Sequence, residues 1–214
     1  RKAGLFTTLH TGGASIPGSF PITGEDLIKI NPQVSFHING GQVSMEDKYF
    51  EIVARDTEIA MQVCTAGNLR TAILCAEMAK KHNAFDRFLI ATDTPTGSGV
   101  MPLGLIYTIS QIASLADFDV AELIAAATGN VAKCYGLNGG FLKVGCDADV
   151  ILIDAPLGGT KSDALSALKN GDPCAIGAVV TAGIPRFVGQ SKNTPPPVRK
   201  IEVIKSNITN MYEG

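Results

Sequence analysis

Short apolar runs and amphipathic stretches alternate along the first half of the chain. The apolar runs are GLFTTLH (4–10), QVSFHI (33–38), EIAMQVC (58–64) and RFLIATD (87–93). Between them, apolar residues recur at helical spacing in DLIKI, KYFEIVA and LRTAILCAEMAKKH. This alternation is typical of consecutive βα units with a parallel sheet.

Polar residues mark the expected starts of these helices. Thr23 with Asp26 precedes DLIKI, Ser44 with Asp47 precedes KYFEIVA, and Asn68 precedes the third stretch. Side chains of these types accept hydrogen bonds from the first free N–H groups of a helix. We therefore expect each helix to begin at its polar residue.

The pattern changes after residue 100. We expect helices over 102–116, 119–127, 130–136 and 162–171. We also expect strands over 139–145 and 148–155, and a hairpin over 175–188 that turns at Ala182-Gly183. Three consecutive prolines make 192–200 an exposed, extended tail. The second half thus predicts a small β-rich element.

The ends of the four predicted strands recur at nearly constant spacing. They are His10, His37, Cys64 and Asp93, which are 27, 27 and 29 residues apart. This period fits one βα unit of a barrel or of a doubly wound sheet. Four units amount to half of a (β/α)8 barrel, which typically needs about 250 residues.

Three of these strand ends carry groups that bind metal. The carboxyl ends of parallel strands converge on one face, so His10, His37 and Asp93 are expected to lie together. Imidazole and carboxylate suit zinc or ferrous iron. Taken singly, each histidine could be a buried or capping residue, and Asp93 could cap a turn before Thr94-Pro95. The shared register favours a metal or acid/base site.

Paired glycines follow both histidines. In Thr11-Gly12-Gly13 and Asn39-Gly40-Gly41 they could let the backbone approach a substrate and leave N–H groups free to bind it. The alternative is that these are turns, which need glycine in any case. The predicted substrate-binding residues are Thr11, Gly12, Gly13, Ser15, Asn39 and Gly40.

The charge and cysteine content of the chain limit the classes of molecule that it is expected to bind and the setting in which it is expected to work. The 18 basic and 20 acidic residues are scattered and give a net charge of −2, so no electrostatic footprint for nucleic acid or an anionic membrane is visible. A small-molecule substrate fits better. The five cysteines form no CxxC pair, which argues against a disulfide framework and predicts a reducing, cytoplasmic setting.

The chain resembles the metal-dependent amidohydrolase superfamily. The resemblance rests on the two strand-end histidines, on Asp93, and on the segment TGNVAKCYGLNGGFLKVGCDADVILIDA (128–155). That segment matches a G-x-x-x-x-G-x-x-A-D-x-x-x-x-D pattern from Gly140 to Asp154. The stretches HTGGASIPGS, FHINGG, ATDTPTGSGVMPLG and SKNTPPPVRK are similar to those of superfamily members that hydrolyse cyclic amides.

The resemblance implies an α/β fold, the C-terminal half of a distorted (β/α)8 TIM barrel plus part of a small β-sandwich. Residues 1–135 would hold barrel strands 5–8, and 136–214 would hold the sandwich portion and tail. His10, His37 and Asp93 would ligate divalent metal, zinc and/or iron, binuclear in the complete protein. Asp93 would also be the general base. A homo-oligomer, a tetramer, is implied as well.

The implied reaction is hydrolysis of a lactam or enamide, with 6-oxo-tetrahydronicotinate giving 2-formylglutarate and ammonia. The superfamily's H-x-H pair and its strand-4 ligand have no counterpart here, so we expect a C-terminal fragment that is inactive alone or binds metal weakly. Two alternatives stay open. One is a dihydroorotase-like or imidazolonepropionase-like enzyme, and the other is a non-catalytic scaffold subunit with this fold.

Overall fold

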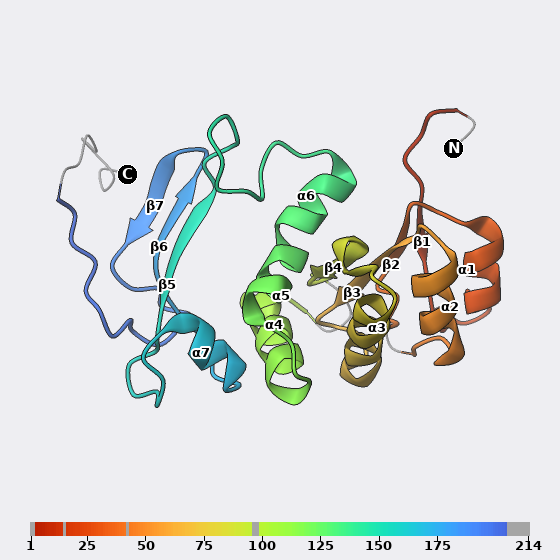
Figure 1. Ribbon diagram of the computed structural model, residues 1–214, viewed down its shortest axis with the longest axis horizontal. Coiled ribbons are helices and arrows are strands. Elements are labelled where there is room, and N and C mark those ends of the chain that lie inside the picture. The colour runs from red at the N-terminus through yellow and green to blue at the C-terminus, as the bar shows by residue number, and fades with distance from the viewer. Residues whose placement is uncertain (1–2, 15, 42, 96–98, 205–214) are drawn as a thin grey trace.

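A computed structural model describes residues 3–14, 16–41, 43–95 and 99–204 and contains two separate sheets (Figure 1). The first sheet is parallel, with its strands in chain order, β1-β2-β3-β4. Its strands are β1 Thr8–His10, β2 Val34–Phe36, β3 Ala60–Cys64 and β4 Phe88–Ala91. The four predicted strands are confirmed, each shorter than its apolar run because the run includes residues of the loop before or after the strand.

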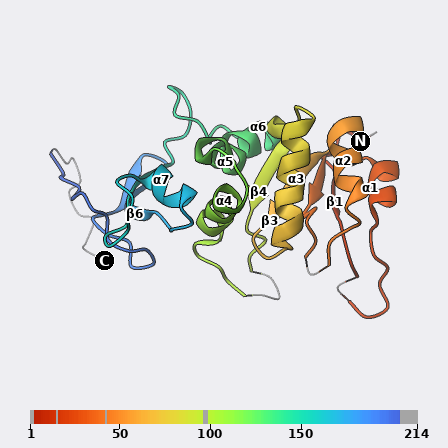
Figure 2. The same cartoon turned by 60° about the horizontal axis from the view of Figure 1, so that its bottom comes forward.

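All the expected helices form. They are α1 Gly24–Ile30, α2 Lys48–Asp56, α3 Leu69–Lys81, α4 Gly104–Leu115, α5 Val120–Ala127, α6 Gly129–Tyr135 and α7 Ala164–Lys169, with a 3-10 turn at Phe85–Arg87. Helices α1 to α3 lie along one face of the parallel sheet (Figures 1 and 2). The loops that lead from β1 and β4 into their helices lie at one edge, the lower edge in Figure 2.

Two of the three predicted helix starts are confirmed together with their side-chain caps. Thr23 Oγ1 accepts a hydrogen bond from Asp26 N (3.2 Å), and the Asp26 carboxylate accepts one from Thr23 N (3.0 Å). This reciprocal pair is a capping box. Asn68 Oδ1 accepts a hydrogen bond from Thr71 N (3.2 Å) and so caps α3 through this single bond.

The helix start predicted at Ser44 with Asp47 before KYFEIVA is also confirmed, but the capping hydrogen bonds expected there do not form. Helix α2 begins after Asp47, whose side chain makes no capping hydrogen bond. Both Asp47 carboxylate oxygens instead accept hydrogen bonds of 2.8 Å from the Arg70 guanidinium on α3. Ser44 Oγ is buried and has no partner among the described residues. A tertiary ion pair has therefore replaced the local cap.

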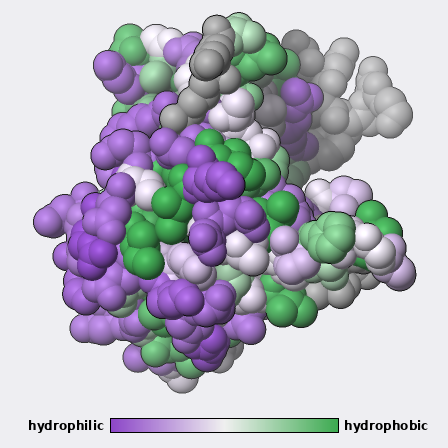
Figure 3. Space-filling view, turned by 90° about the vertical axis from the view of Figure 1, so that its right-hand side faces the viewer, coloured by the Kyte–Doolittle hydropathy of each residue, from purple (hydrophilic) through white to green (hydrophobic). Residues whose placement is uncertain are grey.

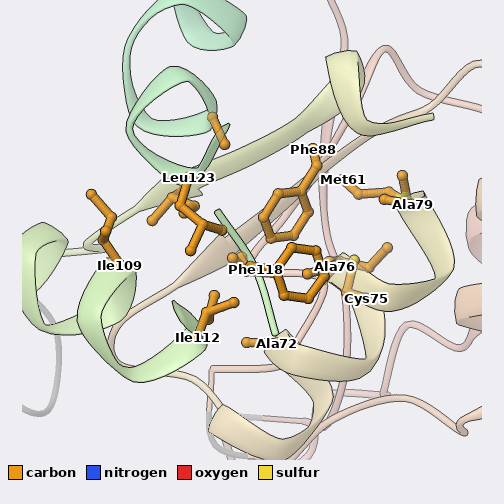
Figure 4. Packing of buried hydrophobic residues seen from close by; sticks show 14 of the residues in the cluster. Met61, Ala72, Cys75, Ala76, Ala79, Phe88, Ile109, Ile112, Phe118 and Leu123 are labelled. Atoms are coloured by element: carbon orange, nitrogen blue, oxygen red, sulfur yellow. The ribbon is translucent and has the colours of Figure 1, made fainter. Parts of the chain in front are cut away.

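Strands β2, β3 and β4 of the parallel sheet are buried on both faces. Phe88 and Ile90 point into the main core, while Leu89 between them belongs to a smaller cluster on the other face. Figure 4 shows part of the main core, in which side chains of the sheet meet those of α3, α4 and α5. The smaller cluster packs against α6 through Val131 and Tyr135. Such two-sided burial explains why the sequence runs are almost continuously apolar.

The second sheet is antiparallel, in the order β5-β6-β7. Its strands are β5 Val150–Asp154, β6 Ala175–Thr181 and β7 Ile184–Val188. The hairpin predicted at Ala182-Gly183 is confirmed, and both turn residues have positive φ, 51° and 75°. Two consecutive positive values match the twist of the flanking strands.

The strand predicted over 139–145 is wrong. The segment forms turns, and Gly140 and Gly145 have φ of 76° and 92°, values outside the β region. A Cβ at Gly140 would lie 2.8 Å from Thr128 O, so this glycine lets the loop pass close to the end of α5. Local alternation of residue types predicted a strand here, but the segment pairs with no strand among the residues that the structure describes.

The tail after β7 forms no helix over the described residues 189–204, but it contains a turn at 192–193 and is less exposed than expected. Thr194 is buried, and its hydroxyl accepts a hydrogen bond from Ile176 N (3.1 Å). Val198 N donates to Ala155 O (3.1 Å). Arg199 donates hydrogen bonds from its backbone N (2.8 Å) and its guanidinium to the Asp154 carboxylate. The tail is therefore attached to the second sheet.

Asp154→Asn is expected to lower the thermal unfolding midpoint at pH 7. The Arg199 guanidinium holds the native pKa of the Asp154 carboxyl well below its usual range. The resulting stabilisation is present above the unfolded-state pKa of about 4 and is lost as the pH falls toward the lower native pKa. Circular dichroism melts should therefore show a difference between wild type and variant that shrinks below about pH 4. An equal difference at pH 3 and pH 7 would contradict this assignment.

Apolar side chains remain exposed near the β1 edge. Leu5, Phe20 and Ile30 are each more than half exposed. Figure 3 faces the side of α1 and α2 and shows apolar atoms between hydrophilic ones. Strands β1 and β4 each pair with one neighbour only. Both outer edges of the parallel sheet are thus unpaired within the described part of the chain.

All five cysteines are free thiols. No helix among the described residues is long and apolar enough to cross a membrane. The cytoplasmic setting stays a prediction, as does the division of the chain at residues 135 and 136.

Candidate functional site

The two histidines at the strand ends lie in direct contact. His10 is the last residue of β1, and His37 directly follows β2 with a positive φ of 33°. His10 Nδ1 and His37 Nε2 are 2.9 Å apart. The rings meet edge to face, with centroids 4.4 Å apart. The parallel register of β1 and β2 places the two side chains at one edge of the sheet.

The facing nitrogens can share a hydrogen bond or a metal ion. A zinc ion with two Zn–N bonds of about 2.0–2.1 Å separates the nitrogens by about 2.9–3.4 Å, depending on the bond angle. Burial, followed by the nearby His10 ring, lowers the pKa of His37 below its ordinary value. A lowered pKa keeps imidazole neutral, which is the form that binds metal. His37 Nδ1 is buried with no partner among the described residues, so the ring's polar contact runs through Nε2.

Asp93 supplies a negative charge at the same edge. It lies two residues beyond β4, is exposed, and has a positive φ of 59°. Its carboxylate charge raises the pKa of His37, in opposition to burial. Asp93 Oδ2 also accepts a weak hydrogen bond from Cys64 Sγ at 4.0 Å. The carboxylate is therefore accessible to a small molecule and close to the histidines.

Cys64 is unsuited to act as a nucleophile. It is the last residue of β3 and is 2% exposed. Burial, helped by the charge of Asp93, raises the pKa of the Cys64 thiol to about 11. A thiol with this pKa stays protonated near neutral pH, whereas the thiolate is the reactive form.

The donors present suit part of a metal site. Among the residues that the structure describes, no group of three or more His, Cys, Asp or Glu side chains lies close enough together to hold a metal ion. His10 and His37 meet directly, while Asp93 acts on them through its charge. The expected three-ligand set is therefore assembled only in part, and the ligand roles stay predictions.

Two of the predicted substrate residues are fully buried and already hydrogen-bonded. Thr11 Oγ1 lies 2.6 Å from Ser35 Oγ on β2. The Asn39 side chain bonds to the backbone of Cys64 and Asn68. Both side chains link the end of one strand to the next strand, which leaves them little capacity to contact a substrate. Ser15 lies outside the described residues.

The expectation of free N–H groups is wrong for three of the four paired glycines. Gly12 N donates to Ile22 O (3.0 Å), Gly13 N donates to Val43 O (2.8 Å), and Gly40 N donates to His37 O (2.6 Å). A Cβ at Gly12 or Gly40 would lie 2.6 Å from backbone atoms of the loop around Val43. These glycines let the loops after β1 and β2 pack against each other. A substrate contact by their carbonyl groups or Cα atoms stays a prediction.

Sequence reasoning missed the partners that organise this edge. Ser35 binds Thr11, and Thr65 Oγ1 lies 2.7 Å from Thr108 Oγ1 and 3.4 Å from Ala91 O. Ser35 is a hydroxyl inside an apolar run, and this is a usable signal because a buried polar group needs a partner. The local pattern around Ser35 does not indicate that its partner is Thr11, which lies 24 residues away in the chain.

A family model described as the amidohydrolase family matches residues 35–194, most of the chain. The chain belongs to the amidohydrolase family. Its strand-end histidines, the carboxylate after β4 and the segment 128–155 are the features on which the resemblance rested.

Individual relatives agree with this membership. The chain is 37% identical over 203 residues to enamidase of Eubacterium barkeri, which covers 95% of this chain and 52% of that protein. It is 30% identical over 124 residues to 5-methylthioadenosine/S-adenosylhomocysteine deaminase 1 of Archaeoglobus fulgidus, which covers 52% of this chain and 28% of that protein. The chain thus spans about half the length of the first relative and less of the second.

Solved structures agree as well. The crystal structure of enamidase superposes with a TM-score of 0.88 at 38% identity, over 93% of this chain and 51% of that chain. A β-aspartyl dipeptidase of Fervidobacterium islandicum AW-1 superposes with a TM-score of 0.55 at 18% identity, over 94% of this chain and 50% of that chain. The second likeness concerns the fold alone. The mixed α/β fold is therefore that of an amidohydrolase.

Proposed function

We propose that this chain provides part of the active site of a metal-dependent hydrolase that opens a cyclic amide, a lactam or an enamide. The observation that carries the proposal is the 2.9 Å approach of His10 Nδ1 to His37 Nε2 in a member of the amidohydrolase family. The identity to enamidase supports an enamide substrate. The proposed reaction consumes 6-oxo-tetrahydronicotinate and two waters and yields 2-formylglutarate and ammonia.

The proposed roles follow from the positions of the side chains. His10 and His37 would hold a divalent metal, zinc and/or iron, through the nitrogens that face each other, with Asp93 as a further ligand. When bound, such an ion polarises the amide carbonyl and makes water a better nucleophile at neutral pH. The Asp93 carboxylate takes the proton of the attacking water and returns it to the leaving ring nitrogen. The loop after β1 would border the substrate at Gly13, the residue of Thr11-Gly12-Gly13 that is not buried.

The finer description of the fold belongs to the same proposal. The consecutive parallel order of β1 to β4, with both outer edges unpaired, supports the C-terminal half of a distorted (β/α)8 barrel. The three-stranded sheet supports part of a β-sandwich. We further propose that the complete protein holds a binuclear centre and assembles as a homo-oligomer, a tetramer.

A substrate panel tests the proposal on the complete, metal-loaded protein. We expect the highest kcat/KM with the six-membered cyclic enamide, measured by loss of ultraviolet absorbance and release of ammonia, and at least about 100-fold lower values with a hydantoin or dihydroorotate. Preference for dihydroorotate or imidazolonepropionate would support the alternative enzymes instead. Absence of hydrolysis with metal bound would favour the scaffold alternative.

A further inference from the structure

Asn39 links the loop after β2 to the end of β3. It follows His37 by two residues, and its side chain is completely buried. Asn39 Oδ1 accepts a hydrogen bond from Cys64 N (2.9 Å), and Asn39 Nδ2 donates to Cys64 O (3.1 Å) and to Asn68 O (3.2 Å). One side chain thus satisfies both backbone groups of the last residue of β3 and one carbonyl at the start of α3.

The backbone of Asn39 strengthens the same link. Asn39 O accepts hydrogen bonds from Asn68 N (3.1 Å) and from Thr71 Oγ1 (3.3 Å). A Cβ at Gly67 would lie 2.4 Å from Asn39 Nδ2, so the glycine permits this close enclosure. Both N–H donors of the amide are used and no face of the side chain is open to solvent, so the amide has no donor left for a substrate.

His37 depends on its backbone for orientation. A metal-binding histidine usually donates its second ring N–H to a fixed acceptor, which sets the direction of the ring. His37 Nδ1 has no such partner among the described residues. The ring direction therefore follows from the backbone around His37, where φ is 33°. That backbone is held by Ile38 N donating to Gln62 O (2.8 Å) and by the Asn39 hydrogen bonds one residue further.

We infer that Asn39 is a positioning residue for His37, which fixes the loop so that His37 Nε2 faces His10 Nδ1. The hydrogen bonds of Asn39, two residues after His37, then have the orienting role that a hydrogen bond from His37 Nδ1 has in other metal-binding histidines. This inference rests on the proposed role of His37 as a metal ligand. It assigns Asn39 to the metal site and not to substrate contact.

The test compares Asn39→Ala with Asn130→Ala in the complete protein. Asn130 is a matched control, since it is also buried and its Nδ2 donates to Phe85 O (2.8 Å) and Phe88 O (3.2 Å). It lies near the amino end of β4, which begins at Phe88, whereas the two histidines lie at the carboxyl ends of their strands. Zn²⁺ affinity is measured by competition with a chromophoric chelator, without substrate. Stability is measured by urea unfolding of the metal-free proteins.

We expect Asn39→Ala to weaken Zn²⁺ binding about 10- to 100-fold, the range seen when support of a metal ligand is lost. At saturating Zn²⁺ the KM for the cyclic amide should stay within about twofold of wild type. Asn130→Ala should lose comparable stability and retain its Zn²⁺ affinity.

Three results would overturn the inference. They are an unchanged Zn²⁺ affinity in Asn39→Ala, a raised KM with full metal binding, and an equal loss of affinity in both variants. If Asn39→Ala does not fold, Asn39→Asp replaces it. This variant keeps the acceptor for Cys64 N but sets a second carboxylate oxygen against two carbonyl groups, and the same weakening is expected. Zn²⁺ affinity is measured without substrate, so the test still decides the inference if the proposed substrate is wrong.

Discussion

Asp93→Asn in the complete protein is expected to reduce kcat for opening of the cyclic amide by about 10²- to 10⁴-fold, the usual contribution of a general base. The amide has nearly the same shape as the carboxylate but has no lone pair basic enough to take a proton from water. Asparagine also tolerates the positive φ of 59° at this position, so the backbone should not change. Steady-state kinetics give the rate, and elemental analysis should find most of the metal still bound.

The matched control is Asp86→Asn. Asp86 is an exposed carboxylate in the 3-10 turn before β4, at the opposite edge of the sheet from Asp93. This variant should turn over at the wild-type rate. A near-normal rate in Asp93→Asn would remove Asp93 from the base role. A loss of metal that parallels the loss of rate would make it principally a ligand.

His10→Ala and His37→Ala are each expected to lower the metal content of the purified complete protein. Each change removes one of two nitrogens that face each other at 2.9 Å. Loss of a donor should cost more than the roughly 10- to 100-fold in affinity that loss of a supporting hydrogen bond costs. Elemental analysis after dialysis against a weak chelator measures the effect, and activity should fall in proportion to bound metal.

His82→Ala provides the control for removal of an imidazole. His82 caps α3, and its Nε2 lies 3.1 Å from Glu51 Oε1 on α2, away from the strand ends. This variant should keep the wild-type metal content. Full metal binding by either His10→Ala or His37→Ala would exclude that histidine from the ligand set.

The features that sequence predicted well are those set by local periodicity. The four strands, their helices and the Ala182-Gly183 hairpin follow from apolar spacing and turn chemistry, which act over a few residues. The meeting of His10 and His37 was also predictable, because equal 27-residue steps in a parallel sheet bring equivalent positions to the same edge.

The features that sequence did not predict depend on contacts between distant residues. Arg70 engages Asp47 from 23 residues away and removes it from the cap of α2. The segment 139–145 has strand-like alternation but pairs with no strand in the described part of the chain. Asn39 was interpreted as a substrate residue because it follows a candidate ligand, whereas its buried hydrogen bonds reach 25 and 29 residues along the chain.

The left-handed backbone at His37 and Asp93 restricts which amino acids these two positions accept. Residues other than glycine rarely adopt positive φ, and histidine, aspartate and asparagine are several-fold enriched among those that do. A saturation library at 37 or 93 would therefore lose most β-branched variants to poor folding before their chemistry could be scored. Directed evolution of this site toward another metal or ring should draw on glycine, asparagine, aspartate and histidine at these codons, and should place wider diversity in the loops that follow.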